Sequence, residues 1–233
     1  MKAADPKEMA IAILNEIRAL KLPNAPQMRE VRRRYSLALR ENDPEFVLNV
    51  AREILSDSDH RWLAAELILT HPSALGLIGE KELLEFGRGM SHWGDVDAFA
   101  GLLAGRVWRE GQVSDALIHG WAGSEDRWWR RAALVATVPL NRRASGGTGD
   151  TDRTLAVCRL LVADRDDMVV KALSWALRDL SVRDPEAVEA FLLEYENILA
   201  ARVKREVRNK LRTGLKNPQR QQKRIESTDG SKG

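Results

Sequence analysis

The sequence predicts an all-α protein whose helical repeats stack into a curved solenoid. Apolar residues recur at helical spacing along almost the whole chain of 233 residues. No run shows the alternating, β-branched pattern of a strand. Short polar breaks separate segments of about 12 to 18 residues, which is the usual length of packed helices and typical of paired helical repeats.

Two helix starts carry the same signal. Residues 42–45 (Asn-Asp-Pro-Glu) and 183–186 (Arg-Asp-Pro-Glu) each place Asp as N-cap, Pro at the first helical position and Glu in the first turn. Four other helices are expected. One follows Pro26 and ends at Leu39, and the others run from Ser58 or Asp59 to Leu69, from Ser124 to Thr137, and from Asp164 or Asp166 to Leu180.

A weak internal repeat supports the solenoid. Residues 126–130 can be laid on residues 167–171, with Asp126 matched to Asp167. In both segments an acid near the helix start leads into a bulky apolar pair and then a cation. Stacked repeats with one buried and one solvated face require such a pattern.

Two stretches interrupt the helical pattern. Residues 141–150 form a glycine-rich loop with Arg142 and Arg143 near its start, and its glycines do not follow a strand as those of a phosphate-binding loop do. We interpret it as a mobile connection rather than a binding loop. Near the C-terminus the apolar pattern stops, so we predict one helical domain over residues 1–215 and a basic, disordered tail over residues 216–233.

Composition excludes several classes of protein. The single cysteine, Cys158, permits neither an internal disulfide framework nor a cysteine-rich metal site, and it points to a reducing compartment. The four histidines lack the pairing of a zinc hydrolase, so we expect no metal and no cofactor. No signal peptide or membrane span is evident, and we expect a soluble, cytoplasmic, monomeric protein without a membrane partner.

Positive charge is concentrated near the C-terminus. Residues 202–224 hold ten Lys or Arg and one acid, so this segment carries +9 while the whole chain carries only +3. Such a stripe is the footprint of a polyanion-binding surface, although a solvated helix followed by a disordered tail would share it. Lys204, Arg208 and Arg212 recur at every fourth residue and are therefore expected to offer one helical flank to phosphates.

Tryptophan is the most informative residue type. Trp93, Trp128, Trp129 and Trp175 each lie within four residues of charged side chains. For any one of them, core packing with extended cations is the more common explanation. Together they indicate a surface with aromatic faces, arginines and a carboxylate. This surface suits a ligand that is anionic outside and cationic at one reacting point, as alkylated DNA is.

Three segments carry a resemblance to a known family. Ser-His-Trp-Gly-Asp-Val-Asp (residues 91–97), Trp-Trp-Arg-Arg-Ala-Ala-Leu (128–134) and Lys-Ala-Leu-Ser-Trp-Ala-Leu-Arg-Asp (171–179) are similar, in order and spacing, to the signature segments of the AlkD family of DNA alkylation-repair glycosylases. The likeness runs from about residue 80 to about residue 215. His92 and Gly94 stand where that family often has an aromatic residue and an acid.

The resemblance implies HEAT-like repeats whose concave face grips double-stranded DNA. It also implies base-excision repair of positively charged N3- and N7-alkylated purines, by hydrolysis of the N-glycosidic bond without a base-flipping pocket. In this assignment Asp97 is the catalytic carboxylate, Trp93 and Trp175 pack against the deoxyribose, and Arg131 contacts the DNA backbone. We expect further phosphate contacts from Arg130, Lys171, Lys204, Arg208 and Arg212, and association with the nucleoid when DNA is bound.

The spacing of the first segment is compatible with this role. Trp93 and Asp97 lie four residues apart, so one helical turn presents both to the same sugar, while Asp95 points away and is assigned to a cap or the surface. Two alternatives remain open. One is a non-catalytic helical-repeat module that binds damaged or branched DNA, and the other is a protein-binding scaffold.

Overall fold

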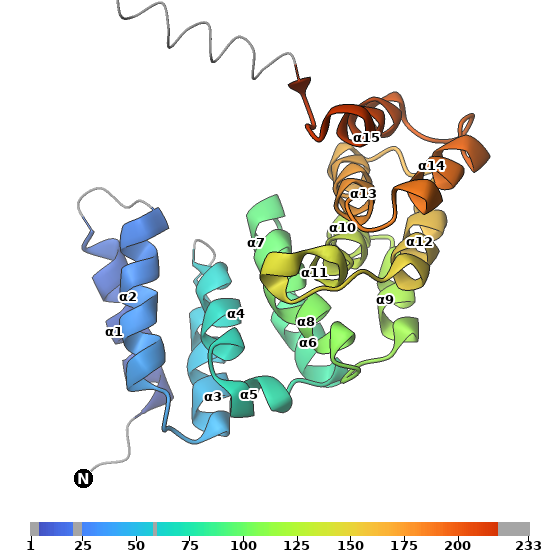
Figure 1. Ribbon diagram of the computed structural model, residues 1–233. Coiled ribbons are helices and arrows are strands. Elements are labelled where there is room, and N and C mark those ends of the chain that lie inside the picture. Colours follow the sequence, from blue (N-terminus) through green and yellow to red (C-terminus); the bar gives the residue numbers. More distant parts are fainter. Residues whose placement is uncertain (1–4, 21–24, 58–59, 219–233) are drawn as a thin grey trace, which may run out of the picture. The chain divides into compact units, whose positions relative to one another are not determined.

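The computed structural model describes residues 5–20, 25–57 and 60–218, and its regular elements are helices (Figure 1). No strand occurs within these three ranges. The chain divides into two compact units, residues 1–117 (unit 1) and residues 118–233 (unit 2). The predicted all-α fold of stacked helical repeats is confirmed. The curvature, the concave DNA-binding face and the limits of the domain and its tail stay predictions, and most of that tail lies outside the described residues.

Unit 1 is a stack of short helices around an aliphatic core. α1 packs on α3, α3 on α4, and α4 on α7 and on the π-helix that follows it. α9 (Asp115–Ala122) carries the chain from unit 1 into unit 2. The elements before it are α1 (Pro6–Arg18), α2 (Ala25–Ala38), α3 (Pro44–Ile54), α4 (Arg61–Leu69), α5 (Pro72–Gly76), α6 (Glu80–Gly87), α7 (Trp93–Ala98), the π-helix η1 (Phe99–Ala104) and α8 (Gly105–Arg109).

Unit 2 is organised around one long buried helix. α13 packs against α10 on one side and α15 on the other, so that these three helices form successive layers, and α12 also packs on α13 (Figure 1). The elements are α10 (Arg127–Ala136), α11 (Val138–Asn141), the 3₁₀ helix η2 (Arg143–Ser145), α12 (Thr151–Leu160), α13 (Asp167–Leu180), α14 (Pro185–Glu194) and α15 (Ala201–Thr213).

Aspartate caps begin the helices that the sequence marked with Asp-Pro. Asp43 Oδ1 accepts a hydrogen bond from the backbone N–H of Glu45 at 2.9 Å, and Asp184 Oδ1 accepts one from that of Ala187 at 3.0 Å. Each bond satisfies an N–H that has no partner within its own helix. The predicted starts of α3 and α14 are therefore confirmed.

Two other starts differ from the prediction by a few residues. α10 begins at Arg127, because Asp126 rather than Ser124 caps it, and the Ser124 hydroxyl instead accepts from the Asp126 N–H. α4 begins at Arg61, while Ser58 and Asp59 lie outside the described residues. A run of several Asx or Ser residues offers competing caps, and tertiary packing decides among them.

The caps also correct the internal repeat. Asp166 caps α13 through the N–H of Met168, just as Asp126 caps α10. Asp126 therefore corresponds to Asp166. In the sequence we had aligned it with Asp167, which is one position too late. With this register, Arg131 of α10 corresponds to Lys171 of α13.

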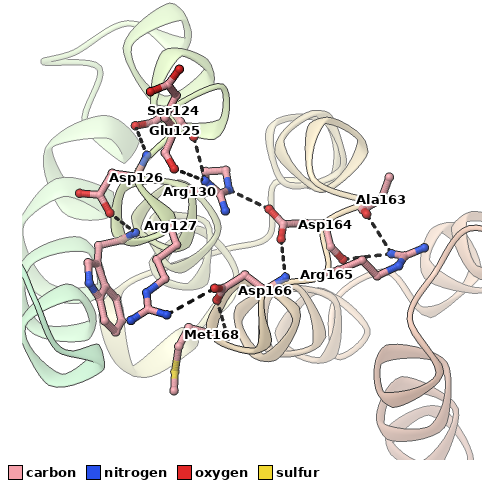
Figure 2. Close-up of polar contacts among 11 residues, drawn as sticks. Ser124, Glu125, Asp126, Arg127, Arg130, Ala163, Asp164, Arg165, Asp166 and Met168 are labelled. Atoms are coloured by element: carbon pink, nitrogen blue, oxygen red, sulfur yellow. Dashed lines mark hydrogen bonds and ion pairs between the residues drawn. The ribbon is translucent and has the colours of Figure 1, made fainter.

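Arginine side chains join successive repeats in unit 2. Arg130 Nε donates to Asp164 Oδ2 at 2.8 Å, and its Nη1 donates to the carbonyls of Ser124 at 3.0 Å and Glu125 at 2.7 Å (Figure 2). One guanidinium thus satisfies loop carbonyls before α10 and a carboxylate before α13. These bonds fix the N-terminal ends of the two helices relative to each other.

Unit 1 contains a similar device at the start of α4. Arg61 Nη1 donates to the carbonyl of Leu55 at 3.0 Å, and its Nη2 donates to the carbonyls of Phe86 at 3.2 Å and Arg88 at 2.7 Å. Burial lowers the pKa of this guanidinium, while the negative charge of Asp95 opposes that shift. Within the described ranges, no helix has both the length and the apolar character needed to span a bilayer.

Candidate functional site

One group of candidate site residues lies on α7 in unit 1. The helix begins at Trp93 because the ring Nδ1 of His92 caps it, accepting the N–H of Gly94 at 3.1 Å. Trp93 and Asp97 therefore stand one helical turn apart, as the spacing predicted. Trp93 is 50% exposed and Asp97 is half-buried. A large aromatic side chain held this far in water offers its ring to a ligand.

Asp95 has a different task in the same turn. Its Oδ2 accepts the backbone N–H of Ser91 at 3.2 Å, and its charge acts on the partly buried guanidinium of Arg61. His92 rather than Asp95 caps α7, so of the two roles predicted for Asp95, a cap or the surface, the structure does not support the cap. Asp95 thus takes part in the local structure, and the catalytic role of Asp97 stays a prediction.

The helix does not end normally after Asp97. It widens into the π-helix η1 (Phe99–Ala104) before α8 resumes the α-helical pitch. Single π-helical turns inside α-helices are frequent at functional sites. We did not predict this turn from the sequence, where the segment between Ala98 and Gly105 is rich in Ala and Gly.

A separate group of candidate site residues lies on α13 in unit 2. The indole Nε1 of Trp175 donates to Asp179 Oδ2 at 2.9 Å, and the same oxygen accepts Arg142 Nη2 at 2.9 Å. The Arg142 guanidinium carbon lies 5.5 Å from the centroid of the Trp175 ring, within cation–π range. The indole is therefore fixed both at its edge and over its face.

Arg142 and Asp179 were missed as site residues at the level of sequence. Asp179 follows Trp175 by four residues, which is a signal that could have paired them on one helical face. Arg142 is distant in sequence and comes from the loop that we interpreted as a mobile connection.

Three cations predicted to bind DNA already have protein partners. Arg131 is only 5% exposed, and its Nη1 donates to the carbonyl of Met168 at 2.7 Å. Lys171 Nζ lies 2.6 Å from Asp167 Oδ2, and Arg130 bridges the loops described above. These contacts give Arg130 and Arg131 a structural role between repeats. Their contacts with DNA, and that of Lys171, stay predictions.

The cations of α15 divide into two groups. Lys204 Nζ donates to the carbonyl of Glu196 at 2.8 Å, and both Lys204 and Arg208 form ion pairs with the Glu196 carboxylate. Arg212 is exposed, and together with Arg205 it borders two surface hollows of about 680 and 610 Å³. Of the three α15 cations predicted from spacing, Arg208 and Arg212 are both exposed, and Arg208 is also paired with Glu196.

A buried carboxylate locks α15 onto α13. Glu206 is 4% exposed, and its Oε2 accepts the hydroxyl of Ser174 at 2.7 Å and lies 3.3 Å from Lys216 Nζ. Burial lowers the pKa of the neighbouring Arg178, and the charge of Glu206 opposes that shift. Because its oxygen is already bonded, Glu206 serves the packing of the helices rather than a reaction.

We also searched the described residues for side chains that could bind a metal ion. Across the described residues, no group of three or more His, Cys, Asp or Glu side chains is placed to hold a metal ion. Cys158 is buried, and burial raises the pKa of its thiol far above the ordinary value. A thiol of this kind is inert as a nucleophile.

Comparison with known families agrees with these features. Residues 15–211 match the model of a family described as DNA alkylation repair enzyme, from within α1 to within α15. No curated protein is significantly similar to the chain. The match includes all three segments on which the resemblance was based, and it makes the protein an enzyme of DNA repair with DNA as its partner. The chain belongs to the DNA alkylation repair enzyme family.

Proposed function

We propose that the protein is a DNA glycosylase that excises positively charged N3- and N7-alkylated purines from duplex DNA. The observation that carries this proposal is the pairing of half-exposed Trp93 with Asp97, one turn apart on α7. Family membership supports alkylated DNA as the substrate. The aromatic ring and the carboxylate of this pair are suited to a reaction at the sugar of the lesion.

The reaction needs little acid–base assistance. Alkylation at N3 or N7 gives the purine a formal positive charge, so the base departs as a neutral molecule without being protonated. As the glycosidic bond breaks, positive charge moves to the deoxyribose. Asp97 stabilises that charge and orients the attacking water. Ordinary glycosides have poorer leaving groups, and their hydrolysis therefore uses a pair of carboxylates.

The two tryptophans add to this stabilisation. Trp93 and Trp175 pack against the deoxyribose and attract its developing charge, with about 0.5 to 2 kcal/mol from each ring. Most enzymes of this class extrude the target base into a pocket. Reaction at the sugar of an already cationic base does not require one.

Phosphate contacts hold the duplex. We assign them to Arg131, Arg130, Lys171, Lys204, Arg208 and Arg212, of which Arg208 and Arg212 are exposed on α15. Neutralised phosphates release counterions, so affinity should fall steeply as salt rises. We further propose that residues 1–215 act as one monomeric unit in the cytoplasm, associated with the nucleoid when DNA is bound, and without a cofactor.

The test is release of free base from duplex DNA that contains a single 7-methylguanine. Asp97→Asn should lower the single-turnover rate by about a hundredfold or more and leave the Kd for the duplex unchanged, because the carboxylate acts mainly in the transition state. Asp95→Asn is the matched control, because an amide oxygen can still accept the Ser91 N–H. A wild-type rate in Asp97→Asn would remove Asp97 from the mechanism.

The same assay addresses the alternative function. Tight, salt-sensitive binding without any base release by the wild-type protein would favour the non-catalytic module that binds damaged or branched DNA. The exposed cations of α15 would be sufficient for that activity.

A further inference from the structure

The glycine-rich loop over residues 141–150 is fixed to the body of unit 2. Asn141 is 2% exposed, its Nδ2 donates to Thr154 Oγ1 at 2.9 Å, and its Oδ1 accepts the Asp150 N–H at 3.0 Å. Both ends of the loop are thus tied to one buried amide. Our interpretation of this loop as a mobile connection is not supported by these contacts.

Arg183 clamps the same loop from the neighbouring repeat. Its Nε donates to the carbonyl of Asn141 and its Nη2 to that of Gly147, both at 2.8 Å. Gly147 is buried so closely that an added Cβ would lie 2.3 Å from the Pro139 carbonyl oxygen. Only glycine fits this close approach between backbones. Arg142 therefore projects from a rigid base.

The side chain of Arg142 is also held in place. Asp179 accepts one of its N–H groups, and its guanidinium lies over the Trp175 ring. The remaining N–H donors of the planar group form no other hydrogen bond within the described residues, and the side chain is 43% exposed. A fixed, partly solvated guanidinium with spare donors is preorganised to bind a phosphate in a bidentate manner.

We infer that Arg142 is a DNA-binding residue that contacts a phosphodiester next to the lesion, and that Asp179 is the residue that positions both Arg142 and Trp175. This inference rests on the proposed function, in which the lesion's deoxyribose packs against Trp175. Every deoxyribose is joined to phosphates on both sides. A cation 5.5 Å from the ring centre is therefore within reach of one of them.

The loop provides a matched control for this site. Arg143 is the next residue, carries the same charge and is exposed, and among the described residues its side chain makes no hydrogen bond or ion pair. Arg142→Ala should weaken binding of the full-length protein to a duplex with one tetrahydrofuran abasic-site analogue by about tenfold. Arg143→Ala should weaken it by less than about twofold, through general electrostatics alone.

Neutral backbone linkages locate the contact. In duplexes where single phosphates beside the analogue are replaced by methylphosphonates, one replacement should weaken the wild type about as much as Arg142→Ala does. Arg142→Ala should bind that duplex no more weakly than it binds the unmodified backbone, because the two changes remove the same interaction. Equal effects of Arg142→Ala and Arg143→Ala, or an Arg142 effect that persists on every methylphosphonate duplex, would overturn the inference.

Asp179 gives a test in which the sign is informative. Loss of an acid beside DNA should strengthen binding if charge alone mattered. Positioning predicts the opposite, with affinity decreasing from wild type to Asp179→Asn to Asp179→Ala, since asparagine retains one oxygen acceptor. Circular dichroism melting identifies any variant that is unfolded. If Asp179→Ala is unfolded, the DNA affinity of Asp179→Asn alone tests the role of Asp179. Tighter binding by folded Asp179 variants would contradict the role of Asp179.

The experiments separate this inference from the proposed function. If the wild type releases no 7-methylguanine but binding depends on Arg142 and one phosphate as described, the glycosylase proposal fails and the phosphodiester site stands. If base release is normal while Arg142→Ala binds like Arg143→Ala, the phosphodiester site alone is wrong.

Discussion

Trp93 and Trp175 have the same proposed role but are held by different means. Trp93 is the first residue of a short helix, half exposed, with the His92 ring tilted against it at 4.9 Å. Trp175 lies in the middle of α13, with its indole N–H bonded to Asp179 and Arg142 over its face. The orientation of Trp93 thus depends on a helix start, whereas that of Trp175 depends on a polar frame from a separate loop.

The frame around Trp175 can be broken without altering either tryptophan. Gly147→Ala should lower the free energy of unfolding by about 2 to 3 kcal/mol, because a Cβ at 2.3 Å from the Pro139 carbonyl oxygen forces the backbone to move. It should also weaken DNA binding, since Arg142 follows the loop. Urea denaturation and the abasic-site duplex measure the two effects.

A helical glycine of the same unit serves as the control. Gly120 lies in α9, where an added Cβ meets nothing within 4 Å. Gly120→Ala should raise the free energy of unfolding by up to about 1 kcal/mol, because alanine has the higher helix propensity. Equal destabilisation by both substitutions would show that the 141–150 loop is not a rigid base for Arg142.

Truncation of the tryptophans themselves sharpens the comparison. Trp175→Ala should lower the free energy of unfolding by about 2 kcal/mol, because packing and the bond to Asp179 are lost. Trp93→Ala should change it by less than about 0.5 kcal/mol, since half of that side chain is already in water. Both variants should release 7-methylguanine more slowly than the wild type in single-turnover assays.

The outcome distinguishes a functional aromatic from a structural one. A loss of base release in Trp93→Ala without loss of stability would assign its effect to the reaction. If Trp93→Ala destabilised the protein as much as Trp175→Ala, the contrast drawn from exposure would be wrong.

Local signals made much of the fold predictable. Asp43 and Asp184 were recognised as caps because each precedes a proline and the capping bond spans only two or three residues. Trp93 and Asp97 were paired for the same reason, since one helical turn sets their spacing. The exact start of α10 was less certain because Ser124 and Asp126 compete for one cap.

The missed features depend on residues distant in sequence. Arg131 carries a charge and was therefore predicted on the surface. It is buried instead, because it donates to the carbonyl of Met168 in the next repeat. The contact between Arg142 and Asp179 joins residues 37 positions apart. No periodicity encodes such pairs, because they arise only when helices stack.

The basic stripe of α15 illustrates the same lesson and gives the smallest predicted effect. Glu196 forms ion pairs with Lys204 and Arg208, two of the three cations predicted to contact phosphates. Desolvation acts to raise the pKa of Glu196, but hydrogen bonds from Arg208 and Lys204 bring it below its ordinary value. The pairing therefore stabilises the fold above that ordinary pKa and is lost as the pH falls through the lowered value.

Glu196→Gln should release both cations at neutral pH and tighten DNA binding by about two- to threefold, with a steeper salt dependence. Glu189→Gln is the control, because it removes the same charge. Glu189 is an exposed acid of α14 and forms no ion pair among the described residues. Equal tightening by both variants would mean that only net charge matters. A larger effect for Glu196→Gln would mean that Lys204 and Arg208 reach phosphates only after leaving Glu196. In the wild-type protein, the ion pairs with Glu196 would then keep these two cations from binding DNA at full strength.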